Sequence, residues 1–492
     1  MAQAHSILDR RRAGILLHIT SLPGAADNGD LGKDAYRFVD FLARAGITVW
    51  QTLPVNPTHP DGSPYQCLSA HAGNPRMIDL GWLVERGWLP EQVLTQAIAA
   101  EPGHRDACLA YAFARFRSDG QSIADLDGFV AEHRHWLDDF ALFMAIRAEQ
   151  GDRPWQTWPE PLRDRDPAAL GAARVRLADR IARVCFEQFL FYGQWRALRA
   201  YANARGVLLF GDIPIFVAGD SADVWARREE FDLTPEGNPR VVAGVPPDYF
   251  SATGQRWGNP HYRWDHMQAN GFRWWLERFR GQLALYDWVR IDHFRGLEAY
   301  WEIPADSATA IEGRWIPAPG QALLEALVHT LGDRGVPLIA ENLGIITPEV
   351  EALRERFDIP GMLILQFAFD GGPGNPYLPH NHTTNNVVYT GTHDNDTTVS
   401  WFEGLSAGQQ AHVRRYLGNP AADMPEALVQ SALASVAKLA ILPLQDVIGL
   451  GQGYRMNTPG TIDGNWAWRF NWSQLADAHA VALSEMVQLY GR

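Results

Sequence analysis

The stretch FRWWLERFRGQLALYDWVRIDHFRG, residues 272–296, contains the pattern that decides the fold. Its first half places apolar residues at helical spacing, and Trp288–Ile291 then forms a short apolar run of the kind that a buried strand needs. The run ends on a charged residue, Asp292. A helix that leads into a buried strand is the repeating unit of parallel α/β sheets and barrels.

The same unit recurs along the chain. Eight apolar runs have strand character and alternate with helical patterns: residues 14–20, 47–53, 207–210, 288–291, 336–340, 362–367, 386–389 and 441–444. Eight strands match a (β/α)8 barrel of the TIM type better than an open sheet of five or six strands. We therefore predict a protein of the α/β class, a (β/α)8 barrel with loops at its mouth.

The alternation is interrupted by residues 83–205, where strand-like runs vanish and helical patterns dominate. We interpret this region as a large helical insertion into the barrel. The chain then divides into three parts: residues 1–75 with the first barrel strands and a long loop, residues 76–205 with the mainly helical insertion, and residues 206–492 with the remainder of the barrel.

The composition argues against several classes of protein. Lys and Arg total 43 against 57 Asp and Glu, a net charge of −14, and no basic stripe is present, so we expect no nucleic-acid partner. No stretch approaches about 18 apolar residues, so we expect no membrane partner. Cys67, Cys108 and Cys185 lack metal-binding or disulfide spacing, which predicts reduced thiols, no metal or other cofactor, and a cytoplasmic location.

Acidic residues follow several of the predicted strands. Four of them come at or shortly after a strand-like run: Asp212, Asp292, Glu341 and Asp394. In a barrel, side chains at the C-terminal ends of the strands converge on one mouth. We therefore expect these four carboxylates to share a pocket, although a single acidic residue after a strand is more often a helix cap or a surface ion pair.

A pair of carboxylates at such a mouth suits the cleavage of a glycosidic bond, which needs an acid for the leaving oxygen and a carboxylate for the anomeric carbon. Asp292 follows Arg290 closely, and a fixed positive charge would hold it ionised as a nucleophile. Glu341 follows an apolar run, where desolvation would keep it protonated as a general acid. The roles of Asp212, as a supporting residue or a substrate contact, and of His393, as a ligand or a structural histidine, stay open.

Three segments in this order, RIDHFRG (290–296), AENLG (340–344) and GTHDNDT (391–397), resemble those of the α-amylase-like barrels in the version typical of 4-α-glucanotransferases, the amylomaltases or disproportionating enzymes. Further segments are similar to that family and extend the resemblance over most of the chain: SLPG to GDLG (21–32), SPYQ to SAHAGNP (63–75), GDIPIFVAGDSADVW (211–225), GVPPDYFSATGQRWGNPHY (244–262) and PGTIDGNWAWR (459–469). The helical insertion is the part that matches poorly.

The resemblance implies roles for individual residues. Asp292 is implied as the nucleophile, Glu341 as the general acid/base and Asp394 as the stabiliser of the transition state. The loop that carries Tyr249, Phe250, Gln255 and Trp257 resembles the family's mobile segment over the acceptor side. The implied substrate-binding residues are Tyr65, Asp212, Tyr249, Gln255, Trp257, Arg290, His293, Asp370, His393 and Asn465.

The implied reaction moves a segment of an α-1,4-glucan, a maltooligosaccharide or starch-like chain, to the 4-hydroxyl of an acceptor by a retaining double displacement. Two alternatives share the same residues: an α-glucan hydrolase, and a glucan-binding protein without activity. A divalent-metal enzyme built on His393, Asp394, Asn395 and Asp396 is disfavoured, because consecutive residues rarely converge on one ion.

Overall fold

The barrel consists of eight parallel strands in one sheet, in the order β10-β11-β12-β1-β2-β3-β6-β9. The computed structural model describes residues 8–24, 28–100, 103–118, 120–247, 251–332, 335–461 and 463–492. The strands are β1 Arg12–Leu16, β2 Val49–Gln51, β3 Leu208–Pro214, β6 Trp288–Asp292, β9 Leu338–Ala340, β10 Gly361–Ile364, β11 Asn386–Tyr389 and β12 Leu439–Pro443. Each overlaps one of the eight apolar runs in the sequence, so the predicted strands are confirmed.

The two outer strands of the sheet meet and close the barrel. The backbone N–H of Ala340, the last residue of β9, donates to the carbonyl of Pro360, which directly precedes β10, at 2.8 Å. The (β/α)8 prediction is therefore confirmed. Every strand pair in the sheet is parallel, so all eight strands end at the same mouth.

The strands are buried on both faces, as their nearly continuous apolar sequences require. One buried cluster draws residues from all eight strands and therefore lies inside the barrel: Leu16, Val49, Phe210, Trp288, Ile339, Met362, Val387 and Leu439. Alternate residues such as Leu209 and Val289 belong instead to the core shared with the surrounding helices. By this alternation the following polar residues face the interior where their strands end: Asp212, Arg290, Asp292 and Glu341.

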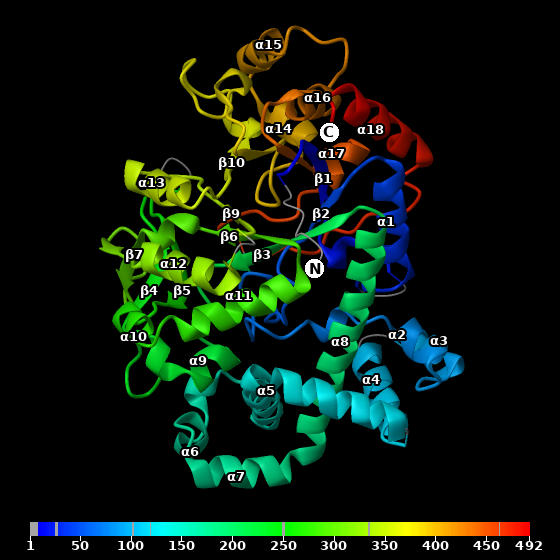
Figure 1. Cartoon of the computed structure of the whole chain (residues 1–492), viewed down its shortest axis with the longest axis vertical. Helices are drawn as coiled ribbons and strands as arrows, with labels where there is room; N and C mark the ends of the chain where they lie inside the picture. The colour runs from blue at the N-terminus through cyan, green and yellow to red at the C-terminus, as the bar shows by residue number, and fades with distance from the viewer. Residues whose placement is uncertain are drawn as a thin grey trace.

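Helices surround the barrel (Figure 1). Those outside the insertion are α1 Lys33–Arg44, α9 Ala222–Ala226, α10 Trp264–Ala269, α11 Arg273–Leu285, α12 Gly320–Leu331, α13 Pro348–Arg356, α14 Thr398–Gly404, α15 Ala407–Tyr416, α16 Glu426–Ala434, α17 Leu444–Ile448 and α18 Asp477–Leu489. No helix among the described residues is long and apolar enough to span a bilayer.

Between β2 and β3 the described residues contain helices and no barrel strand. The main helices there are α2 Leu80–Glu85, α3 Glu91–Ala100, α4 His104–Phe116, α5 Gly120–Glu149, α6 Glu160–Arg163, α7 Pro167–Arg176 and α8 Ala178–Ala204. Two glutamines of the long helix α8 tie this region to the loop after β2. The Gln188 side chain exchanges two hydrogen bonds with the backbone of Gly73, at 2.8 and 2.9 Å, and Gln194 makes the same pair with Asp79, at 2.8 and 3.1 Å.

A second, antiparallel sheet stands in the loops that follow β3 and β6, and the sequence did not indicate it. Its strands are β4 Val241–Val245, β5 Gln255–Pro260, β7 Ala299–Pro304 and β8 Arg314–Pro317, in the order β5-β4-β7-β8. Gln255 and Trp257 were expected to lie in a loop, and this expectation is wrong, because both belong to β5. The strand contains a glycine and a proline and no apolar alternation, which hides its character in the sequence.

We predict that Gly211→Ala destabilises the barrel. A Cβ at this position of β3 would lie 2.2 Å from Cδ2 of the buried Tyr286, and overpacking of this kind costs about 1–3 kcal/mol. Gly128→Ala in α5 is the matched control, because no atom lies within 4 Å of its added Cβ and alanine favours a helix. When measured by urea denaturation, the free energy of unfolding should be lower than that of the native chain for Gly211→Ala and not for Gly128→Ala. Equal stability of Gly211→Ala and the native chain would contradict this account.

Candidate active site

Arg290 lies between two carboxylates at the mouth of the barrel. The register of β3 against β6 places Asp212 directly opposite Arg290. Nη1 of Arg290 donates to Oδ2 of Asp212 at 2.5 Å, and its Nη2 donates to Oδ1 of Asp292 at 2.7 Å. The nearby negative charges raise the pKa of Arg290 well above its usual value, against the effect of burial. The guanidinium therefore stays charged and fixes the orientation of both carboxylates.

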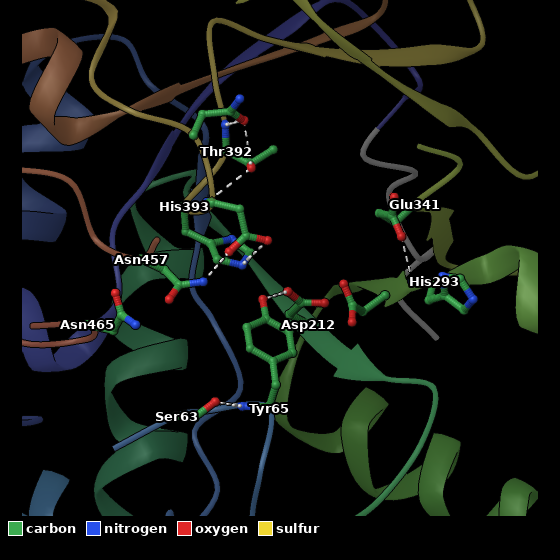
Figure 2. A network of polar contacts seen from close by, with 12 residues as sticks. Ser63, Tyr65, Asp212, His293, Glu341, Thr392, His393, Asn457 and Asn465 are labelled. Carbon is green, nitrogen blue, oxygen red and sulfur yellow. Dashed lines mark hydrogen bonds and ion pairs between the residues drawn. The ribbon is translucent and has the colours of Figure 1, made fainter. Parts of the chain in front are cut away.

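Asp212 is a buried member of this group. Its side chain is 0% exposed, whereas that of Asp292 is 30% exposed. The Tyr65 hydroxyl donates to Oδ2 of Asp212 at 2.7 Å and covers it from the side of the mouth (Figure 2). Burial raises the pKa of Asp212 to about 7, and Arg290 acts in the opposite direction. Of the two roles that the sequence left open for Asp212, support of the pocket fits its burial better.

Glu341 comes one residue after β9, beside the end of β6. Ile291 pairs with Ala340 in the register of these neighbouring strands, so Asp292 and Glu341 occupy the next positions on each. The Glu341 carboxylate accepts from the backbone N–H of His293 at 2.7 Å and of Leu343 at 2.9 Å. Burial, followed by the charge of Asp292, raises the pKa of Glu341 to about 7, although Arg290 and the two backbone donors oppose the shift. The group is thus poised to exchange a proton near neutral pH.

His293 has a left-handed backbone, with φ of 57°, which is uncommon for a residue other than glycine. This conformation accompanies the backbone N–H contact to Glu341 (Figure 2). Burial lowers the pKa of His293 to about 3, so its ring is neutral, and its Nε2 has no hydrogen-bond partner among the described residues. The rings of His293 and Trp257 pack edge to face, with their centroids 4.9 Å apart. This contact brings β5 of the second sheet to the site. Nε1 of Trp257 donates to Oε1 of Gln255 at 3.1 Å.

Asp394 and His393 come from the loop after β11. Nε2 of His393 lies 3.4 Å from Oδ2 of Asp394, and burial lowers the pKa of His393, which favours a neutral ring. The imidazole stacks on the ring of Tyr65 at 5.2 Å between centroids. Because Tyr65 also contacts Asp212, the four predicted carboxylates belong to one connected site (Figure 2).

Several residues of this site were missed in the sequence. Nδ2 of Asn457 donates to Oδ1 of Asp394 at 2.6 Å, and Nη2 of Arg455 donates to the Asp394 carbonyl at 2.7 Å. The Trp466 ring packs against Tyr65 and His393 at 5.8 and 5.9 Å between centroids. Asn457 and Arg455 lie in a polar loop without strand or helix periodicity, so no pattern singled them out; Trp466 lay in a Trp-rich segment that resembled the family.

Two of the predicted substrate-binding residues make side-chain hydrogen bonds within their own loops. The Asn465 side chain bridges two residues of its own loop. Its Oδ1 accepts from the Thr458 backbone N–H at 2.8 Å, and its Nδ2 donates to the Thr461 carbonyl at 2.9 Å. Asp370 is exposed, and its Oδ1 accepts from Nδ2 of Asn375 at 3.1 Å. Tyr249 lies outside the described residues.

The arrangement can deliver a proton and a nucleophile to one bond. Asp292 and Glu341 end neighbouring strands, while Asp394 approaches from a third strand with a half-exposed carboxylate. Among the described residues no group of three or more His, Cys, Asp or Glu side chains is arranged to hold a metal ion. The chemistry available from the side chains in place is acid–base and nucleophilic.

Comparisons with known proteins identify the family of this chain. The family model described as 4-alpha-glucanotransferase matches residues 17–475. The chain is 49% identical to the 4-alpha-glucanotransferase of Synechocystis, over 99% of each chain, and 49% identical to that of Thermus thermophilus, over 97% of this chain and 98% of the other. The amylomaltase of Streptococcus agalactiae in complex with acarbose superposes with a TM-score of 0.95 at 38% identity, over 98% of this chain and 100% of that one. The chain belongs to the 4-alpha-glucanotransferase family.

Proposed function

We propose that this chain transfers a segment of an α-1,4-glucan to the 4-hydroxyl of an acceptor glucose or glucan by a retaining double displacement. Asp292 is the nucleophile, Glu341 the general acid/base and Asp394 the stabiliser of the transition state. The observation that carries the proposal is the pair at the ends of β6 and β9: a carboxylate in an ion pair with Arg290 beside a carboxyl whose pKa burial raises to about 7. A retaining mechanism requires two carboxyl groups with these different tasks.

In the first step Glu341 gives its proton to the glycosidic oxygen, and an Asp292 oxygen bonds to the anomeric carbon as the bond to the leaving sugar breaks. In the second step the Glu341 carboxylate takes the proton from the acceptor's 4-hydroxyl, whose oxygen displaces Asp292 from the same carbon. Positive charge develops on the sugar ring in both steps, and the Asp394 carboxylate stabilises it. Two inversions at one carbon give net retention.

We propose further that the predicted substrate-binding residues differ in how they act. Asp212 supports the pocket from beneath Tyr65, because it is fully buried. We propose direct sugar contacts for the residues around the catalytic carboxylates, Tyr65, Gln255, Trp257, Arg290, His293 and His393, and a contact by Tyr249, Asp370 or Asn465 stays a prediction. The aromatic rings of Tyr65 and Trp257 suit the apolar faces of glucose, and the neutral imidazoles can hydrogen-bond its hydroxyl groups.

The substrates we propose are maltooligosaccharides or starch-like glucans. Support comes from the acarbose in the complex of the Streptococcus agalactiae amylomaltase, an oligosaccharide-like ligand. We also propose that the enzyme works in the cytoplasm. Support for a reducing compartment comes from the three cysteines, Cys67, Cys108 and Cys185, which are all free thiols.

Incubation with maltotriose separates transfer from hydrolysis. We expect glucose together with a ladder of longer maltooligosaccharides, and an almost constant number of reducing ends, because a sugar hydroxyl replaces water as the acceptor. Chromatography of the products and a reducing-end assay on the same samples check both expectations. Products no longer than maltotriose with rising reducing ends would establish the hydrolase alternative, and no change would establish a binding protein.

The pH dependence tests the role of Glu341. Because its raised pKa lies at about 7, the acid is protonated below that pH, and kcat/KM for maltotriose should fall about tenfold per pH unit above it. Glu341→Gln should lower kcat/KM by roughly 10²–10⁴-fold and remove the alkaline decline. The variant should retain activity on α-maltosyl fluoride, whose leaving group needs little protonation.

Glu355→Gln is the matched control, because this glutamate lies on the surface of α13 with a side chain that is 69% exposed. Its rate and pH profile should equal those of the native enzyme. A Glu341→Gln variant that keeps the alkaline decline would assign the proton transfer to another group.

A further inference from the structure

We propose that Asn457 is a positioning residue for the reaction: its side-chain amide holds the Asp394 carboxylate toward the sugar ring without neutralising its charge. The inference rests on the proposed role of Asp394 and adds a residue that acts through it. It starts from the contact of 2.6 Å between Nδ2 of Asn457 and Oδ1 of Asp394.

Both oxygens of Asp394 have a nitrogen neighbour. Oδ1 accepts from Asn457, and Oδ2 lies 3.4 Å from Nε2 of His393. Half of the carboxylate nevertheless stays open, because the side chain is 45% exposed. The two contacts orient the carboxylate and leave part of it accessible to the substrate.

Asn457 is itself held by the loop that it must orient. Its backbone N–H donates to the His393 carbonyl at 3.1 Å, and its own carbonyl accepts from Nε of Arg455 at 2.8 Å. Nη2 of the same Arg455 side chain donates to the Asp394 carbonyl at 2.7 Å, so Arg455 links Asn457 to Asp394. On the other side, the neighbouring Met456 carbonyl accepts from the Trp466 backbone at 2.8 Å. Residues 455–457 therefore form a clamp on the backbone of residues 393 and 394, which fixes the position from which the Asn457 side chain reaches Asp394.

The chemical type of the hydrogen-bond donor distinguishes the Asp394 carboxylate from that of Asp292. Asp292 forms an ion pair with a guanidinium, and its task is to form a bond. The task of Asp394 is to offer negative charge to a developing cation, and a direct ion pair would cancel part of that charge. Here the guanidinium of Arg455 contacts the Asp394 carbonyl, whereas the carboxylate accepts from the neutral amide of Asn457 and lies beside the ring of His393, whose lowered pKa favours its neutral form. An amide orients the anion and preserves its charge.

The test is Asn457→Leu, which keeps the size and removes the donor, with Asn457→Asp as a second variant that replaces the donor by an acceptor. We expect kcat for maltotriose transfer to fall roughly 10- to 100-fold while KM stays within about threefold, because the contact acts on the transition state. Acarbose is an oligosaccharide analogue with a basic nitrogen in place of one glycosidic oxygen, and its affinity should fall by a similar factor in calorimetry, whereas the affinity for maltose should not.

Asn385→Leu is the matched control. Its Nδ2 makes the same kind of contact, to Oδ1 of Asp358 at 2.9 Å, but it precedes β11, at the end of the barrel opposite the mouth. This variant should transfer at the native rate. Melting temperatures close to that of the native chain would establish that the Asn457 variants are folded.

A double-mutant cycle with Asp394→Asn separates positioning from direct contact. If Asn457 acts through Asp394, Asn457→Leu should change acarbose affinity less than twofold in the Asp394→Asn background. The proposal is overturned if the loss persists there, if KM rises while kcat is unchanged, or if both Asn457 variants transfer at the native rate. If the native enzyme showed no transfer at all, the proposed function would be refuted. The double-mutant cycle would still test the role of Asn457, because it measures acarbose affinity and not transfer.

Discussion

The active site depends on one guanidinium shared by two carboxylates. Arg290 contacts Asp212 across the register of β3 and β6 and Asp292 along its own strand. A buried arginine of this kind needs partners, because an unpaired charge in such a place is costly. Asp212 satisfies one side of the guanidinium from below, and the other side is left to orient Asp292. The buried Asp212 and the more exposed Asp292 therefore share the charge of the same guanidinium.

The barrel supplies the geometry for this arrangement through strand register. Asp292 and Glu341 take equivalent positions on adjacent strands, and the alternation that sends Trp288 and Ile339 inward also sends both carboxyl groups to the mouth. Asp394 has no such constraint, because it lies five residues beyond the end of β11. Its position depends on the backbone clamp from residues 455–457. The three carboxylates are thus placed by two different means.

The sequence predicted what depends on periodicity and failed where structure depends on distant contacts. Eight buried strands read as apolar runs, and the acidic residues after them, Asp292 above all, could be assigned to one mouth from the fold alone. The antiparallel sheet was missed because β5 has no alternation of apolar and polar residues. Asn457 was missed because its importance lies in a partner 63 positions away. Asn465 was chosen by resemblance; its side chain bonds within its own loop, and its contact with sugar stays a prediction.

The paired hydrogen bonds of Gln188 and Gln194 limit how the helical insertion can be exchanged in protein engineering. They join α8 to the backbone of the loop that begins after β2 and includes Tyr65, and Gly73 within that loop has no room for a side chain beside Phe191. The insertion therefore cannot be exchanged as an independent cassette. A chimera that takes this region from another member of the family must bring the loop at 56–79 with it, because these hydrogen bonds and this packing join the two segments.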